Sequence, residues 1–136
     1  IAQGKFSNEE FKLINQKNIE NFIKSDLWQT FKLASINKKL NRETQFIMGI
    51  PANELGTDSN ELVLVQGIID AYMEDETEDL ILVDYKTDKV ENEEVLKDRY
   101  EKQLYYYAKA IENITRKKVS KKYIWSFSLG KEVEIR

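Results

Sequence analysis

The chain has 136 residues, of which 41% are hydrophobic and 33% are charged. This length suits one well-cored domain and is too short for two, and the balance is that of an ordinary globular protein, not of a disordered or membrane-spanning chain. Because the sequence contains no cysteine and no histidine, disulfides, thiolate metal sites, cysteine nucleophiles and histidine bases are all excluded. Any catalysis must therefore use carboxylates, lysine, tyrosine and bound ions.

The formal net charge of −3 is not typical of a free-standing nucleic-acid binder, which would carry a strongly basic face. If this domain handles DNA, we expect another part of the protein to deliver it. The first residues lack the basic-then-apolar order of a signal peptide, so we expect a cytoplasmic protein. A start at Ile1 without methionine favours an excised piece of a larger protein.

Two helices are predicted before the first strand. Residues 7–25 repeat apolar side chains at helical spacing, and Ser7 with Glu10 forms a capping box. A shorter helix is predicted from Ser25 or Asp26 until a polar stretch interrupts it. The apolar positions of the two helices are Phe11, Ile14, Phe22, Ile23, Leu27, Trp28, Phe31 and Ala34. We interpret both helices as structural.

Three strands are predicted next. The apolar period changes to two from Leu40 to Ile50, and residues 51–60 form a loop around the only proline. A second strand is predicted from Glu61 to about Met73, and a third over residues 80–87, joined as a hairpin by the acidic turn 74–79. Apolar side chains on both faces of the second strand predict a central position covered on both sides: Leu62, Val63, Leu64, Val65, Ile68 and Ile69.

The rest of the chain predicts a helix and two more strands. The helix is expected over residues 93–114, with one apolar stripe formed by Tyr100, Leu104, Tyr107, Ile111 and Ile114. A strand is expected over residues 119–129, and a turn at Gly130 leads to a last strand over residues 132–136. The order of elements predicts an α/β domain in which helices flank a mixed central sheet.

Two acidic residues interrupt otherwise apolar strands. Asp70 follows Gly67-Ile68-Ile69, and Asp84 precedes Tyr85-Lys86. A carboxylate beside a buried strand must be paired, hydrogen-bonded or metal-bound to stay charged. Because side chains alternate along a strand, Asp84 and Lys86 are expected on one face, while Tyr85 points away and leaves its carbonyl available.

Such a trio has a catalytic and a structural interpretation. If Asp70 and Asp84 came within about 4 Å, their repulsion would cost about 4 kcal/mol at an effective dielectric of roughly 20, and a divalent cation would remove it. Oxygen ligands favour Mg²⁺ or Mn²⁺, which would activate water on a phosphodiester while Lys86 orients that water or neutralises developing charge. The alternative is an ordinary Asp84–Lys86 salt bridge and a turn-adjacent Asp70, and spacing alone leaves both open.

Gln103 and Tyr107 lie four residues apart, on one side of the expected helix. They could face a catalytic site or a DNA strand. Taken alone, their spacing favours the other interpretation, a core tyrosine beside a glutamine at the edge of the core.

Taken in order, these motifs resemble a known family. Gly67-Ile68-Ile69-Asp70, Asp84-Tyr85-Lys86-Thr87 and the segment 100–107 (YEKQLYYY) resemble the RecB-like nuclease branch of the PD-(D/E)xK superfamily. Within it, the nuclease domains at the C-terminus of AddA subunits of AddAB helicase–nucleases match best. The resemblance runs from about Arg42 onward and implies a restriction-endonuclease-like core over residues 40–136, behind a helical segment 1–39, in a single domain.

The resemblance implies a role for each matching residue. Asp70, Asp84 and the Tyr85 carbonyl would be metal ligands, and Lys86 the catalytic lysine. Gln103 and Tyr107 match a Q-x-x-x-Y element that supports the site and contacts DNA, while Glu43 matches an acidic position near the metal. The implied reaction is Mg²⁺-dependent hydrolysis of DNA, mainly of unwound single strands, in repair and recombination, with Mn²⁺ as a possible substitute.

The implied partners are DNA, helicase domains of the same polypeptide and the second nuclease subunit of the heterodimer, with no membrane. No glycine-rich phosphate loop occurs, so ATP use is not assigned to these residues. The family also has an upstream helix with a G-T-x-x-H-like motif whose histidine joins the metal. This chain has no histidine, so we expect that helix to precede Ile1 and the isolated chain to be weakly active or inactive.

Two other functions compete with the nuclease. A non-catalytic DNA-binding or scaffold domain could use the basic groups Lys38, Lys39, Arg42 and residues 116–122, although retention of the carboxylates and lysine argues against it. The structural interpretation of residues 116–118 is a basic cluster that stabilises the negative pole at the end of a helix. A protein-interaction domain using exposed aromatic residues has little specific support.

Overall fold

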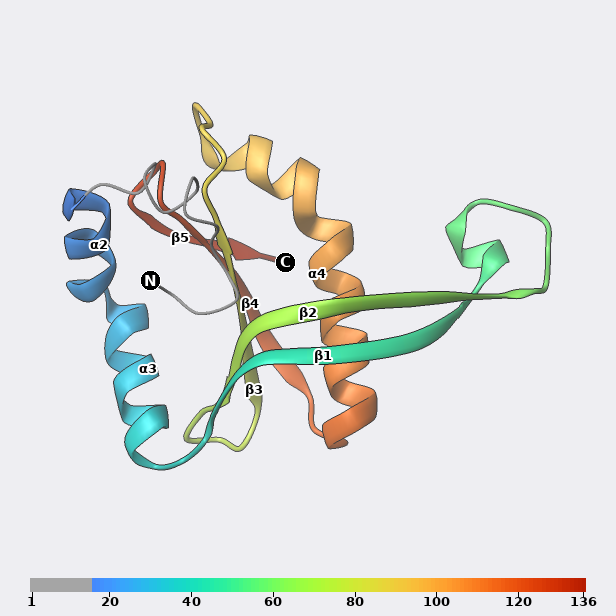
Figure 1. Ribbon diagram of the computed structural model, residues 1–136, viewed down its shortest axis with the longest axis horizontal. Helices are drawn as coiled ribbons and strands as arrows, with labels where there is room; N and C mark the ends of the chain where they lie inside the picture. The colour runs from blue at the N-terminus through green and yellow to red at the C-terminus, as the bar shows by residue number, and fades with distance from the viewer. Residues whose placement is uncertain (1–15) are drawn as a thin grey trace.

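The fold is that of a computed structural model, which describes residues 16–136 (Figure 1). The expected capping box at Ser7, with Phe11 and Ile14, lies outside these residues. The observed elements are α2 (Gln16–Ile23), α3 (Asp26–Ile36), β1 (Leu40–Pro51), the 3-10 turn η1 (Ala52–Leu55), β2 (Leu62–Glu74), β3 (Leu80–Lys86), α4 (Glu93–Thr115), β4 (Val119–Ser126) and β5 (Lys131–Ile135). The predicted start of the first helix lies outside the described residues, and η1 lies in the predicted loop. The other boundaries agree with the prediction to within about three residues.

The strands form one sheet in the order β1-β2-β3-β4-β5. Neighbouring strands are antiparallel except β3 and β4, which are parallel because α4 carries the chain from one to the other. Helices α2 and α3 lie on one side of the sheet and α4 lies on the other (Figure 1). The predicted α/β domain with a mixed sheet is confirmed.

Each side of the sheet has its own hydrophobic core. The core under α3 contains Leu27, Phe31, Ala34, Ala71, Met73, Ile81, Val83, Trp125 and Phe127. The core under α4 contains, among others, Ile69, Tyr72, Leu82, Leu96, Leu104, Ile111, Ile124 and Val133. Because β3 is covered from both sides, its residues Leu80 to Asp84 are all buried. Alternation along β3 then decides which side chain meets which helix.

Local capping explains where the helices begin. The Ser25 hydroxyl accepts a hydrogen bond from the Trp28 amide at 3.1 Å, which starts α3 where the sequence predicts it. The Asn92 side chain accepts from the Val95 amide at 3.3 Å, and Glu93 and Glu94 follow in the first turn of α4. Acidic groups there suit the positive pole of the helix.

The prediction that β2 is covered on both faces along its length is wrong for its first half. β2 pairs with β3 only from Ala71 to Glu74, and its earlier residues pair with β1 alone in a ribbon that extends beyond the sheet (Figure 1). Leu62 is 69% exposed, Leu64 75% and Ile68 50%. One face of the ribbon packs toward α4, but α3 does not extend over the opposite face. The apolar side chains on that opposite face are therefore exposed, although the sequence is apolar on both faces.

A second correction concerns the stripe predicted along α4. Leu104 and Ile111 are buried, whereas Ile114 is 58% exposed. Ile114 lies in the last turn of the helix, beyond the residues that α4 contributes to the core. The stripe is therefore shorter than its apolar period suggests.

The β1–β2 ladder is broken beside Asp70. Its pairs run Arg42–Ala71 and then Thr44–Ile69, and between them Glu43 has a left-handed φ of 51°. Ile69 packs in the core under α4 and Ala71 in the core under α3, although residues two apart on a regular strand share a face. The two strands thus change faces at Asp70 while their register is kept, with one residue of each strand left out of the ladder.

Candidate active site

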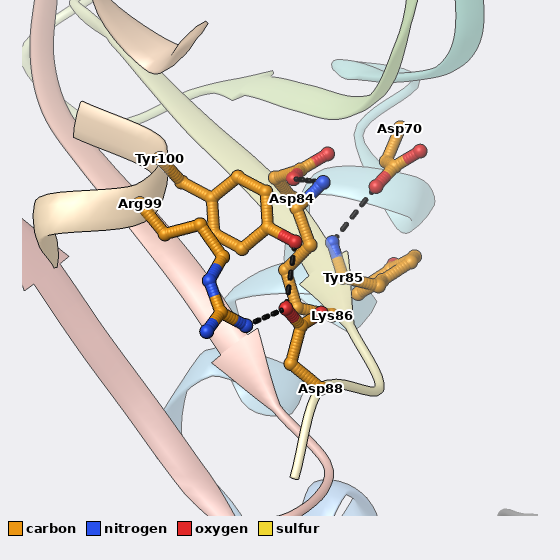
Figure 2. Close-up of polar contacts among 7 residues, drawn as sticks. All are labelled: Asp70, Asp84, Tyr85, Lys86, Asp88, Arg99 and Tyr100. Carbon is orange, nitrogen blue, oxygen red and sulfur yellow. Dashed lines mark hydrogen bonds and ion pairs between the residues drawn. The ribbon is translucent and has the colours of Figure 1, made fainter. Parts of the chain in front are cut away.

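Asp84 and Lys86 meet at the end of β3, as the strand period predicts. The Lys86 ammonium lies 3.0 Å from Asp84 Oδ2, and the Asp84 residue is only 2% exposed (Figure 2). Both residues have the same parity as Leu80 and Leu82, which pack in the core under α4. The pair therefore faces α4.

Asp70 reaches the same part of β3 from the neighbouring strand. Its Oδ2 accepts a hydrogen bond from the Tyr85 amide at 2.8 Å, and the residue is 7% exposed (Figure 2). The Tyr85 ring points away, as predicted, and packs against Phe22 with ring centroids 5.9 Å apart. The Asp84–Tyr85 peptide therefore lies beside two buried carboxylates: that of Asp84 itself, and that of Asp70 on the adjacent strand, which accepts from its N–H.

Tyr107 and Gln103 belong to the helix that faces this trio. Burial, together with the negative charges of Asp84 and Asp70, raises the pKa of the Tyr107 phenol to about 12. Tyr107 thus lies within electrostatic reach of both carboxylates, protonated at neutral pH. One turn earlier, Gln103 Oε1 is buried with no hydrogen-bond partner among the described residues. The structural alternative for this pair stays open: Tyr107 is partly buried and packs on Phe46, at 5.4 Å between ring centroids, while the charges of both carboxylates also act on its phenol.

The residues present fit a small divalent cation. Asp70 and Asp84 offer buried carboxylate oxygens, and on α4 the buried Oε1 of Gln103 has no hydrogen-bond partner in the described part of the chain. Oxygen donors of this kind suit Mg²⁺ or Mn²⁺. Over residues 16–136 no group of three or more His, Cys, Asp or Glu side chains is placed to hold a metal ion. Mg²⁺ is usually held in proteins by one or two carboxylates together with waters.

Glu43 lies opposite Asp70 at the break in the ladder and is exposed. Its left-handed backbone was not foreseen, since glutamate does not favour that conformation. A role for Glu43 near the metal stays a prediction, as does a role for the Tyr85 carbonyl.

A polar network around Lys86 was not predicted from the sequence. Its ammonium lies 4.1 Å from the centre of the Tyr100 ring, the Tyr100 hydroxyl donates to Asp88 Oδ2 at 2.7 Å, and Arg99 pairs with the same oxygen at 2.6 Å (Figure 2). Burial works against the charge of Asp88, but the hydrogen bonds from Tyr100 and Arg99 hold its pKa below the usual range. Asp88 stands in a polar loop, and no spacing rule linked it to the helix.

Of the basic groups considered for DNA contact, Lys39, Lys117 and Lys118 lie at the other end of β3, whereas Arg42 acts electrostatically on Tyr85 beside the site. The Lys118 carbonyl accepts a backbone hydrogen bond from Leu80 at the start of that strand. Lys117 pairs with Glu74 at 2.7 Å, and Lys39 also acts on Glu74 electrostatically. These cations neutralise the acidic turn of the β2–β3 hairpin, which weakens the proposal that they form a phosphate-binding surface.

The sheet order, the helix between the parallel strands and the paired carboxylates with lysine define a nuclease-type α/β domain. The chain matches the PD-(D/E)XK nuclease superfamily over residues 6–134 and belongs to it. The predicted family is confirmed.

Relatives identify the kind of protein in which such domains occur. The chain is 43% identical over 134 residues to the A subunit of the ATP-dependent helicase/nuclease from Clostridium botulinum (strain Alaska E43 / Type E3), covering 93% of this chain and 11% of that protein. It is 42% identical over 135 residues to the protein of the same name from Thermoanaerobacter sp. (strain X514), covering 94% and 11%. For the namesake from Lachnoclostridium phytofermentans the identity is 34% over 171 residues, covering 98% and 12%. The chain spans about a tenth of the length of these relatives. No helix within residues 16–136 is long and apolar enough to cross a membrane.

Proposed function

We propose that this chain is the nuclease module of an ATP-dependent helicase–nuclease and hydrolyses phosphodiester bonds of DNA, mainly of unwound single strands. The observation that carries the proposal is the meeting of two buried carboxylates, Asp70 and Asp84, with Lys86 at 3.0 Å from the second of them. The superfamily and the names of the relatives support the same activity.

Asp70 and Asp84 would hold a divalent cation, with Mg²⁺ favoured over Mn²⁺ and the Tyr85 carbonyl as a further ligand. When bound, such an ion supplies a more acidic water and neutralises charge on the phosphate. Lys86 places a positive charge beside the carboxylates, where it can orient that water or stabilise the negative charge that develops on the phosphate. The Tyr85 amide keeps Asp70 oriented through its 2.8 Å hydrogen bond.

Gln103 and Tyr107 complete the site from α4. The Tyr107 phenol stays protonated at neutral pH, since its pKa lies at about 12, and it can donate a hydrogen bond to a DNA oxygen. Gln103 Oε1, which has no partner within residues 16–136, can accept one from a bound water or a base. We further propose that residues 1–136 form one domain, 1–39 being its helical segment and 40–136 its catalytic core.

The net charge of −3 agrees with delivery of the strand by other parts of the protein, since affinity from phosphate contacts needs cations. We therefore place helicase domains on the same polypeptide, a second nuclease subunit beside it, and the assembly in the cytoplasm. ATP use belongs to those other domains.

The test is degradation of end-labelled single-stranded DNA, with and without Mg²⁺, by the full-length protein together with a partner subunit whose own nuclease site has been inactivated. Asp84→Asn and Lys86→Ala should each lower the Mg²⁺-dependent rate by at least about 100-fold, the range seen when a charge-stabilising group is removed. A matched control is the exposed ion pair of Glu94 and Lys97 on α4, 3.4 Å apart: Glu94→Gln and Lys97→Ala should leave the rate unchanged. Wild-type rates in both site variants would refute the assignment.

A further inference from the structure

We propose that Tyr100 is a positioning residue, which holds the Lys86 ammonium in the site through its aromatic face, and that Asp88 and Arg99 fix the orientation of its ring. This inference rests on the proposed nuclease function, because it concerns how the lysine of that site is held. Tyr100 comes from the second turn of α4 and Asp88 from the loop that follows β3.

Two groups contact the Lys86 ammonium, a carboxylate and an aromatic ring. The ammonium lies 3.0 Å from Asp84 Oδ2 and 4.1 Å from the centre of the Tyr100 ring. A cation within about 6 Å of a ring centroid is attracted by the negative face of the ring. The Lys86 side chain is 16% exposed, so this attraction acts where water screens it little.

The two contacts differ in whether they use the N–H donors of the lysine. A carboxylate accepts a hydrogen bond and so uses one of the three N–H donors, whereas a ring face attracts the charge and leaves the donors free. Tyr100 can therefore fix the end of a flexible four-carbon chain without occupying the groups that must meet water or phosphate. Fixing that position matters, since a misplacement of about 1 Å can cost about 100-fold in rate.

The ring is itself anchored at its far end. The Tyr100 hydroxyl donates to Asp88 Oδ2 at 2.7 Å, and Arg99 pairs with that oxygen at 2.6 Å. Arg99 neutralises Asp88, so the anchor adds little net charge beside the lysine. Figure 2 shows the resulting chain of contacts from Arg99 through Asp88 and Tyr100 to Lys86.

The experiment measures single-turnover cleavage of single-stranded DNA by the full-length protein, paired with a partner subunit whose own nuclease site has been inactivated. It separates the maximal rate from the protein concentration that gives half of it. Tyr100→Leu should lower the maximal rate about 10- to 100-fold and move the half-saturating concentration less than about 3-fold. Tyr100→Phe, which keeps the ring, should stay within about 3-fold of wild type. Asp88→Asn, which leaves ring and lysine in place, should fall between the two.

Tyr105→Leu is the matched control. Tyr105 is on the same helix and also carries a lysine over its ring, with Lys109 at 5.5 Å from the centroid, but it is 47% exposed. This variant should cleave like wild type.

The decisive comparison repeats Tyr100→Leu in a Lys86→Ala background. If the ring acts through the lysine, the double variant should be no slower than Lys86→Ala alone. An equal loss in both backgrounds, an equal loss in Tyr105→Leu, or a Tyr100→Phe as slow as Tyr100→Leu would overturn the proposal. A Lys86→Ala variant of wild-type rate would instead refute the proposed function itself, so the two failures are distinguishable.

Discussion

Gly67 offers a test of how tightly the ribbon packs against α4 beside the site. A Cβ added at this position would lie 3.1 and 3.2 Å from two ring atoms of Phe46 and 3.4 Å from Cε1 of Tyr107. Phe46 is the cross-strand partner of Gly67 and is buried, so its ring cannot simply turn into solvent. Gly67→Ala must therefore push two rings aside, and one of them is the tyrosine that faces the carboxylates.

The size of the effect follows from two opposing contributions. Overpacking of this kind costs about 1–3 kcal/mol. Replacing glycine by alanine in a conformation that alanine tolerates stabilises by about 0.4–1 kcal/mol, because the unfolded chain loses freedom. The net expectation for Gly67→Ala is a destabilisation of about 1–2 kcal/mol, or about 3–8 °C in the unfolding temperature of a domain of this size.

Gly49→Ala is the matched control in the same ribbon, where the nearest atoms to an added Cβ are the Leu62 methyl groups at 3.7 Å. This is ordinary contact, so its unfolding temperature should stay within about 2 °C of wild type. Both variants are compared by circular dichroism during heating, and DNA cleavage by the full-length protein should fall only for Gly67→Ala. If the two glycines gave equal shifts, the packing argument would be refuted.

Two further predictions concern the helical side and β5. Ser25→Ala removes the cap of α3 and should cost about 1 kcal/mol, seen as a drop of about 3–5 °C on heating, whereas the exposed Ser35→Ala should change little. Burial raises the pKa of Glu132, whose Oε2 has no hydrogen-bond partner in the described part of the chain. Ionisation therefore costs stability as pH rises through that pKa. Glu132→Gln should raise the unfolding temperature by about 1–2 °C at pH ~7, and the gain should vanish near pH ~4; a gain that persists there would contradict this cause.

The features that could be predicted from the sequence are those set by local geometry. Alternation along β3 is enough to bring Asp84 and Lys86 together and to send the Tyr85 ring the other way. The cap at Ser25 is also local, since the hydroxyl bonds to an amide three residues later. In each case the interacting groups lie within one turn or two strand positions, so no knowledge of the tertiary fold was needed.

The features that could not be predicted join distant segments. Tyr100 reaches Lys86 across the gap between α4 and β3, and its partner Asp88 belongs to a loop whose path depends on both elements. The exposure of Leu64 likewise depends on how far α3 extends over the sheet, which its apolar neighbours in the sequence do not reveal.

The break at Glu43 shows how a strand can deliver a carboxylate to the edge of a core. On a regular strand Asp70 would have Ile69 and Ala71 together on the face opposite to its own. Here those two residues enter different cores, so the chain turns over at Asp70. Its carboxylate then accepts from the Tyr85 amide across the strands instead of facing an apolar layer, where an ionised oxygen would need a partner. The left-handed backbone of Glu43 carries a conformational cost of about 1–3 kcal/mol. This cost accompanies the turn in the chain that brings Asp70 to the Asp84–Tyr85 peptide of β3. The proposed metal site depends on that arrangement, in which the carboxylates of Asp70 and Asp84 lie beside the same peptide.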